Sequence, residues 1–124
     1  MDLTNPLRRS FFLMHEYGIA YDIVVTSRKA ALDNNATSIT HIYVDVGELS
    51  IINPDQVEFL FTTIVEDDPL FKDAKLTCTK VKPQTRCSCG YIGSEIFVCP
   101  ECGQLPEIEK GKEVVVTRIE VEAD

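Results

Sequence analysis

The chain has 124 residues, of which 44% are hydrophobic and 26% are charged, a composition that predicts one globular domain with a modest core. Its 12 basic and 20 acidic residues give a formal net charge of -8, which repels phosphate backbones and argues against nucleic-acid binding. No apolar run is long enough to cross a membrane, and no nucleotide loop or catalytic triad is visible, so we expect a cytoplasmic protein that is not an enzyme.

Residues 1–13 carry no convincing structural pattern of their own. An arginine pair at Arg8 and Arg9 is followed by apolar residues, but His15 and Glu16 interrupt that run too early for an export signal. We therefore expect residues 1–13 to be an extension that precedes the folded domain, with Met14 as an alternative start to Met1.

The first predicted helix begins near Ile19 and ends near Asn35. Its apolar residues recur at three- and four-residue spacing: Ile19, Ala20, Ile23, Val24, Ser27, Ala30 and Ala31. After it, Ile42, Val44 and Val46 alternate with polar residues up to Gly47, which predicts a strand with one buried face.

A second helix is predicted from Asn53 onward. Asn53 has the character of an N-cap, Pro54 suits the first helical position, and Asp55 favours the positive end of the helix dipole. The apolar face of this helix contains Val57, Leu60, Phe61, Ile64 and Val65. The acidic cluster before Pro69 ends it.

Two further strands are predicted at residues 74–81 and 113–121, the latter with Val115, Thr117, Ile119 and Val121 on one face. The segment between them is cysteine-rich. We therefore expect an α+β fold, a small three-stranded sheet with two helices on one face plus an inserted zinc ribbon. The α+β domain would use residues 14–82 and 108–124, and the ribbon residues 83–107.

The ribbon is predicted from two close cysteine pairs, Cys87 with Cys89 and Cys99 with Cys102. Four thiolates from two tight turns can converge on one tetrahedral zinc ion, whose binding contributes on the order of 10 kcal/mol to folding. So short a loop cannot bury enough apolar surface to fold alone, and metal would replace a core. Disulfide bonds are the main alternative, but nothing else suggests secretion.

The first cysteine pair departs from the usual spacing, because only Ser88 separates its two members. Residues i and i+2 of an extended strand share a face, so both sulfurs can still reach one ion. Gly90 and Gly103 follow the two pairs, where positive φ is often needed. The fifth cysteine, Cys78, shares a strand face with Leu76 and is interpreted as a small packed residue rather than a ligand.

A second group with metal chemistry is the segment Met14-His15-Glu16 before the first helix. Alone, a His-Glu pair is weak evidence, since a solvated helix N-terminus, with Glu16 favouring the helix dipole, is the more common explanation. His41, the only other histidine, lies at a polar strand position and is interpreted as a surface or partly packed residue.

The order of several segments adds to this evidence. Met14-His15-Glu16-Tyr17, then Gly47-Glu48-Leu49-Ser50 and Asn53-Pro54, then the cysteine pairs, and finally residues 119–122 follow one another at the spacing of the HypA/HybF family. The chain resembles this family of nickel-incorporation metallochaperones from Met14 to about Glu122.

The resemblance implies a structural zinc site at Cys87, Cys89, Cys99 and Cys102, and a transient nickel site at His15 and Glu16, with His15 supplying its imidazole and Glu16 assisting. It further implies delivery of Ni(II) to the large-subunit precursor of a NiFe hydrogenase, or in urease maturation, with a HypB-type GTPase as partner. Whether the chain also forms a weak homodimer is left open by the sequence. Soft thiolates suit zinc, whereas Ni(II) favours tetragonal nitrogen and oxygen ligands, so ligand type would separate the two metals.

Two other functions remain open at this stage. The cysteine turns are also similar to those of rubredoxins, in which four thiolates hold a redox-active iron for electron transfer. A ribbon that serves only as a protein or nucleic-acid adaptor would predict no nickel affinity, and the acidic net charge disfavours it.

Overall fold

The computed structural model describes residues 2–3 and 16–124. In chain order, the elements are β1 (Asp2–Leu3), α1 (Glu16–Asp33), β2 (Ser38–Gly47), the 3-10 helix η1 (Glu48–Ser50), α2 (Pro54–Ile64), the 3-10 helix η2 (Pro69–Phe71), β3 (Lys75–Val81), β4 (Gln84–Arg86), β5 (Ile92–Gly93), β6 (Glu107–Lys110) and β7 (Val114–Glu122).

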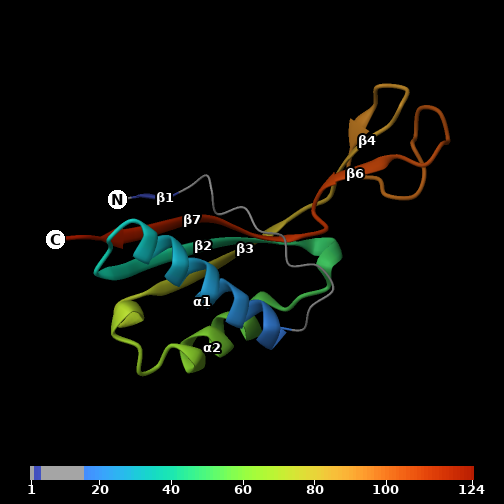
Figure 1. Ribbon diagram of the computed structural model, residues 1–124. Coiled ribbons are helices and arrows are strands. Elements are labelled where there is room, and N and C mark those ends of the chain that lie inside the picture. The colour runs from blue at the N-terminus through green and yellow to red at the C-terminus, as the bar shows by residue number, and fades with distance from the viewer. Residues whose placement is uncertain (1, 4–15) are drawn as a thin grey trace.

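The main layer is a sheet with the strand order β1-β7-β2-β3, and α1 and α2 cover one of its faces (Figure 1). The predicted α+β fold is confirmed, and the three predicted strands are β2, β3 and β7. The structure adds β1, two residues that pair antiparallel with β7. The core lies between the sheet and the two helices.

The apolar stripe predicted for the first helix faces the sheet. Ile19, Ala20 and Ile23 are fully buried on α1, and Ala31 closes the stripe near its end. The chain turns after α1 at Asn35, which has a positive φ of 56°. Asparagine tolerates this left-handed conformation better than most residues, because its short polar side chain can bond locally.

The predicted start of α2 is confirmed in detail. The Asn53 side-chain oxygen accepts hydrogen bonds from the backbone N–H groups of Asp55, at 3.0 Å, and Gln56, at 3.3 Å. Pro54 occupies the first helical position, where its missing N–H costs nothing. Two of the N–H groups that a helix start leaves unpaired therefore have a partner.

Strands β2 and β3 are parallel, from His41 opposite Lys75 to Gly47 opposite Val81. Parallel neighbours need a crossover connection, and here α2 supplies it. The same connection returns α2 to the face already covered by α1, where Val57 and Phe61 are buried.

The predicted buried face of the last strand is wrong in its first half. Val114 and Val116, not Val115 and Thr117, are buried on β7. The reason is a bulge: Tyr43 lies opposite Arg118, but the next residue of β2, Val44, lies opposite Val116. Thr117 is therefore an extra residue, and it shifts the alternation by one position.

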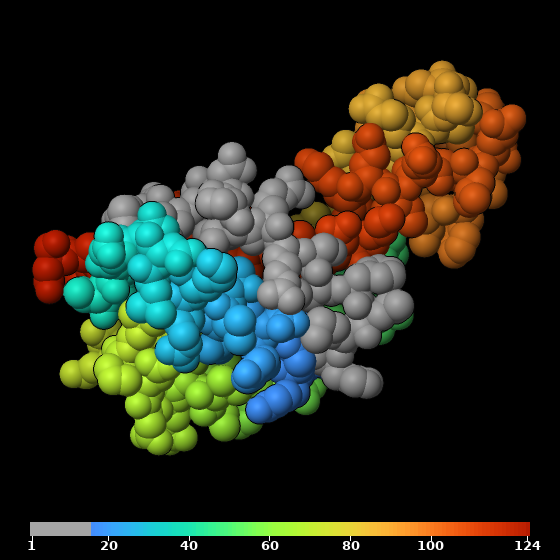
Figure 2. Space-filling view, viewed as in Figure 1, coloured from blue at the N-terminus to red at the C-terminus, as the bar shows by residue number. Residues whose placement is uncertain are grey.

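The cysteine-rich insertion forms its own small sheet with the order β5-β4-β6. It projects from one end of the main sheet as a separate lobe, which we call the ribbon (Figure 2). Strand β4 pairs antiparallel with both β5 and β6, so the ribbon sheet spans residues 84–110.

Within residues 2–3 and 16–124, no helix has the length and apolar character required to span a membrane.

Candidate metal centre

The two cysteine pairs of the ribbon meet, as predicted. The sulfur ligand atoms of Cys87, Cys89, Cys99 and Cys102 all lie within 4.8 Å of one another. The sulfurs of Cys87 and Cys102 are 3.3 Å apart, and those of Cys89 and Cys99 are 3.7 Å apart. Among residues 2–3 and 16–124, this is the one cluster of three or more metal-ligating side chains of such closeness.

The sulfur positions fit a tetrahedral zinc ion. Zinc–sulfur bonds of about 2.3 Å require sulfur–sulfur separations of about 3.8 Å, close to the distances found here. Cys87 and Cys99 are buried while Cys89 and Cys102 are exposed, so the cluster lies at the surface of the ribbon, where an ion can enter. The donor set and geometry are those of a closed structural site.

The unusual spacing of the first pair is accommodated by a shorter turn. The Cys87 carbonyl accepts the Gly90 N–H at 2.9 Å, and the Cys99 carbonyl accepts the Gly103 N–H at 2.8 Å. Both glycines have positive φ, 99° and 77°, as the sequence predicted. The first turn is thus closed by a hydrogen bond between residues three positions apart, and the second by one between residues four positions apart.

The thiols influence one another's ionisation. The backbone N–H of Cys89, followed by the thiol of Cys102, lowers the pKa of Cys87 to about 6. The Gln104 N–H lowers the pKa of Cys102, but the Cys87 hydrogen bond, burial and the remaining thiols outweigh it and raise that pKa to about 12. One thiolate in the cluster therefore opposes the next, and a divalent cation would relieve this repulsion.

A buried threonine, Thr85, contacts the loop between the two metal-binding turns. Thr85 on β4 is 1% exposed, and its hydroxyl lies 2.9 Å from the Glu95 carbonyl and 3.2 Å from the Gly93 carbonyl. These contacts tie the strand before the first turn to the loop that leads to the second turn. They could not be predicted from the residue pattern, because they depend on the ribbon's strand pairing.

Cys78 lies on β3, outside the cysteine cluster, in agreement with its interpretation as a packed residue. It is half-buried and packs against the core cluster. Burial, followed by the charge of Glu58, raises the pKa of its thiol to about 12. This thiol is therefore a poor metal ligand and a poor nucleophile at neutral pH.

The predicted nickel residues are only partly described. His15 lies outside the described residues. Glu16 is the first residue of α1, and its carboxylate oxygen Oε2 accepts a hydrogen bond from the backbone N–H of Asn53, at 3.1 Å. The start of α1 is thereby joined to the start of α2, a contact that the sequence did not predict.

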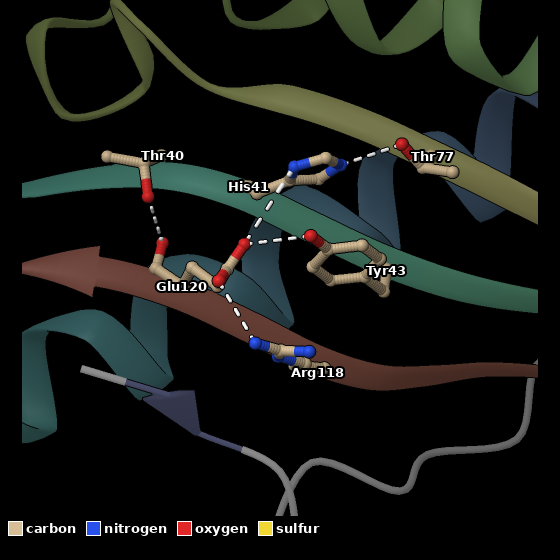
Figure 3. Close-up of polar contacts among 6 residues, drawn as sticks. All are labelled: Thr40, His41, Tyr43, Thr77, Arg118 and Glu120. Carbon is tan, nitrogen blue, oxygen red and sulfur yellow. Dashed lines mark hydrogen bonds and ion pairs between the residues drawn. The ribbon is translucent and has the colours of Figure 1, made fainter.

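His41 belongs to a polar network on the face of the sheet opposite the helices (Figure 3). Its ring stacks on Tyr43, with centroids 4.0 Å apart, and its Nε2 lies 2.7 Å from the Thr77 hydroxyl. Glu120 accepts hydrogen bonds from the Tyr43 hydroxyl, at 2.8 Å, and from Arg118, at 3.1 Å. His41 is thus partly packed, as expected, and the network as a whole links β2, β3 and β7.

Comparison with known proteins gives a consistent result. A family model described as "Hydrogenase/urease nickel incorporation, metallochaperone, hypA" matches residues 14–121. Two proteins named hydrogenase maturation factor HypA are similar along nearly their whole length. The one from Methanocella arvoryzae is 34% identical over 113 residues, covering 88% of this chain and 99% of its own. The one from Methanococcus aeolicus is 36% identical over 125 residues, covering 90% and 99%.

The fold also matches a solved structure. The solution structure of the Ni metallochaperone HypA from Helicobacter pylori superposes with a TM-score of 0.71 at 26% sequence identity, covering 90% of this chain and all of that one. The similarity therefore includes both the helix-covered sheet and the ribbon.

Proposed function

The chain belongs to the HypA family of hydrogenase/urease nickel-incorporation metallochaperones, and from this premise we propose that it carries Ni(II) and delivers it during maturation of a NiFe hydrogenase. The observation that carries the proposal is the extent of the family match. It begins at Met14, next to His15, and continues past the cysteine cluster. Both candidate metal segments therefore belong to the region that the family shares.

We assign the four ribbon cysteines, Cys87, Cys89, Cys99 and Cys102, to a structural zinc ion. The support is the convergence of their sulfurs within 4.8 Å. Bound zinc supplies the ribbon with a charged centre that replaces a hydrophobic core. The chain's own part is to hold four sulfurs in place through the two glycine turns and the buried Thr85.

The nickel ion is cargo, and we assign it to the segment around His15 and Glu16. His15 supplies an imidazole nitrogen, neighbouring backbone nitrogens complete a mostly nitrogen plane, and Glu16 assists. Ni(II) prefers such tetragonal nitrogen and oxygen sets, whereas zinc prefers the soft thiolates. Each ion therefore has a different ligand type, and the transient one sits outside the ribbon.

Transfer requires partners, and the net charge of -8 favours cations and basic protein surfaces over nucleic acid. We propose a HypB-type GTPase and the large-subunit precursor of a NiFe hydrogenase as the partners, with urease maturation as a second destination for the metal. The protein acts in the cytoplasm as a carrier and not as an enzyme, and it self-associates weakly as a homodimer.

Calorimetry tests the proposal directly. Zinc-loaded protein that begins at Met1, and the same protein beginning at Met14, are each titrated with Ni(II). One specific site per chain is expected, with tighter binding when the free amine lies next to His15. No specific uptake with either start would refute the carrier function.

Absorption spectroscopy separates the carrier from an electron-transfer protein. Protein purified with zinc should be colourless, because zinc has a filled d shell. A coloured preparation that contains iron would favour the rubredoxin-like alternative.

A further inference from the structure

The ribbon carries large apolar side chains that it does not bury. Phe97, Val98 and Leu105 are 76%, 57% and 75% exposed. Convergent thiolates replace a hydrophobic core in this lobe, so its fold does not require these side chains. Apolar residues that are exposed singly are ordinary on a protein surface, but here three of them belong to one loop around a metal-binding turn.

The three residues come together at the second cysteine turn. The Cys99 N–H donates to the Gln104 carbonyl at 2.8 Å, which brings the chain entering the turn next to the chain leaving it. Val98 directly precedes Cys99 and Leu105 directly follows Gln104, so Val98 and Leu105 lie beside each other. Phe97 is the next residue along the chain. We call Phe97, Val98 and Leu105 the tip patch.

The tip patch belongs to the part of the molecule that projects. Figure 2 shows the ribbon as a lobe that, in this view, stands clear of α1 and α2. A surface on such a lobe can be reached by a partner much larger than a small ligand. Exposed apolar patches with a polar border are typical of protein interaction sites.

The surroundings of the tip patch are negatively charged. Residues 87–109 contain no lysine, arginine or histidine, and they contain four glutamates: Glu95, Glu101, Glu107 and Glu109. Arg86 of β4 pairs with Glu109 at 3.1 Å, whereas Glu101 and Glu107, which flank Leu105 in the sequence, are exposed. Bound zinc does not reverse the sign, because four thiolates outweigh the two charges of one zinc ion. The tip patch therefore lies in a negative electrostatic field.

This combination of features defines the kind of partner. Nucleic acids and anionic lipid surfaces carry phosphates, which the glutamates repel. A symmetric pair of ribbons would bring like charges together, which disfavours a second copy of the chain. A protein segment with an apolar face bordered by lysine or arginine matches both the exposed side chains and the charge.

We propose that the tip patch is a docking surface for a basic amphipathic helix of a partner protein. The apolar face of that helix covers Phe97, Val98 and Leu105, and its cations face Glu101 and Glu107. This role rests on the proposed carrier function, because a carrier must dock on another protein to pass on its metal. The tip patch places one such contact on the ribbon.

A synthetic peptide serves as the probe. It has about 14 residues, with leucines at helical spacing and lysines at the remaining positions. Fluorescence anisotropy with the zinc-loaded chain should show saturable binding. Two control peptides should bind at least ~10-fold more weakly: one with the same composition but scrambled leucines, and one with glutamates in place of lysines. Equal binding of the scrambled peptide would show that charge alone acts and would overturn the proposal.

A pair of double variants tests the apolar contact. Phe97→Ser combined with Leu105→Ser should weaken peptide binding by at least ~10-fold, with zinc content unchanged. The matched control combines Phe59→Ser with Leu32→Ser, which removes side chains of the same two types that are 68% exposed on α2 and 58% exposed on α1. Its peptide affinity should stay within about 2-fold of that of the parent chain. Equal losses in both double variants would overturn the docking surface.

A second pair of double variants tests the charge. Glu101→Gln combined with Glu107→Gln should weaken peptide binding by about 3-fold at low salt and reduce its salt dependence, because fewer ion pairs remain to be screened. The matched control combines Glu66→Gln with Asp67→Asn, which removes the same charge from exposed residues beyond α2. This control should bind the peptide with nearly the affinity of the parent chain. A loss as large in the control would show that net charge, and not the tip patch, attracts the peptide.

NMR spectra locate the contact without any substitution. When the peptide is added to the zinc-loaded parent chain, the amide signals of residues 97–105 should shift and those of α1 and α2 should not. Shifts confined to α1 or α2 would overturn the proposal.

Sedimentation equilibrium and nickel titration separate the other outcomes. Conversion of a dimer to a monomer by Phe97→Ser with Leu105→Ser would assign the tip patch to a second copy of the chain and overturn the proposal. The same variant should take up nickel as the parent chain does. Absence of nickel binding in the parent chain would count against the carrier function, whereas peptide binding reports on the tip patch alone.

Discussion

Glu58 on α2 accepts a hydrogen bond from the backbone N–H of Cys78 on β3, with 2.9 Å between the nitrogen and Oε2. Strand β3 is an edge of the main sheet, and the Glu58 side chain occupies one of the groups that such an edge leaves unpaired. The same contact places a carboxylate beside the Cys78 thiol. Burial is the larger cause, and Glu58 the second, of a Cys78 pKa of about 12.

Cys78 should therefore resist alkylation in the folded protein. Its pKa of about 12, against an ordinary 9.0, reduces the thiolate fraction near pH 8 by on the order of 1,000-fold. We expect iodoacetamide to modify Cys78 of the zinc-loaded protein at least ~100-fold more slowly than in denaturant, as followed by mass spectrometry.

The control for this experiment is Glu58→Gln, which removes the negative charge and keeps an acceptor for the Cys78 N–H. Alkylation of Cys78 should be faster in this variant than in the parent chain, though still slower than in denaturant because burial remains. Rapid labelling of the parent Cys78 would show that the thiol is not protected.

Replacement of His15 by alanine should abolish specific nickel binding. The imidazole is the proposed side-chain ligand, while zinc and the core involve other residues. Calorimetry with Ni(II) measures the loss, and zinc analysis together with circular dichroism should show unchanged zinc content and helicity.

His41→Ala is the matched control, since His41 is the chain's other histidine and belongs to the Tyr43 and Thr77 network on the sheet. It should leave nickel uptake intact. If His15→Ala binds nickel as well as the parent chain does, the site assignment is wrong.

Cys102→Ser should release zinc and unfold the ribbon. Loss of one of four thiolates removes the closed tetrahedral set, and we expect zinc affinity to fall by at least ~100-fold. A chromophoric chelator competition measures the affinity, and the helix signal at 222 nm should stay close to that of the parent chain because α1 and α2 pack on the main sheet. Cys78→Ser, which changes a cysteine outside the cluster, should retain zinc fully.

The ion pair of Arg28 and Asp68, with 2.5 Å between nitrogen and oxygen, should contribute pH-dependent stability. Its hydrogen bond is the main reason that the pKa of Asp68 is lowered from 3.8. A lowered folded-state pKa stabilises the fold above the unfolded pKa, and this contribution disappears as pH falls through the folded pKa. Because the Arg28 side chain is 42% exposed, solvent screens the pair and limits its contribution to about 0.5–1 kcal/mol.

In urea unfolding, Asp68→Asn should accordingly have a free energy of unfolding about 0.5–1 kcal/mol lower than that of the parent chain at neutral pH. This difference should be smaller below about pH 3.8. The comparison variant is Asp33→Asn, which removes the ion pair with Lys29. This pair is exposed, with 76% of the Lys29 side chain and 60% of the Asp33 side chain accessible to solvent. It should cost no more than a few tenths of a kcal/mol. A constant Asp68→Asn effect across this pH range would contradict the linkage.

Local patterns predicted the features that local chemistry determines. Asn53 and Pro54 place the start of α2 because capping involves only the next three residues. The four cysteines predict their own convergence because one ion requires all of them. The glycine after each pair predicts its own positive φ, because a tight turn requires a residue without a side chain at that position.

Features that depend on distant partners could not be predicted in this way. The bulge at Thr117 exists because of pairing with β2, where the Thr117 hydroxyl bonds to the Tyr43 carbonyl, and alternation within β7 alone cannot reveal it. Gly47 similarly packs against the backbone of Gly111, more than sixty positions later in the sequence, and only this contact explains why a side chain is excluded at Gly47. Cross-strand register, more than propensity, is the missing information.

The ribbon leaves the sheet after Val81 and re-enters it at Val114, and both residues lie beside the end of β2, opposite Gly47 and Val46. Two strand spacings of about 4.8 Å separate the exit from the entry, a gap that a few residues could bridge. An excised or exchanged lobe would thus leave the hydrophobic interior intact. Evolution could treat the metal-binding lobe as a detachable module, acquired or replaced independently of the body that carries it.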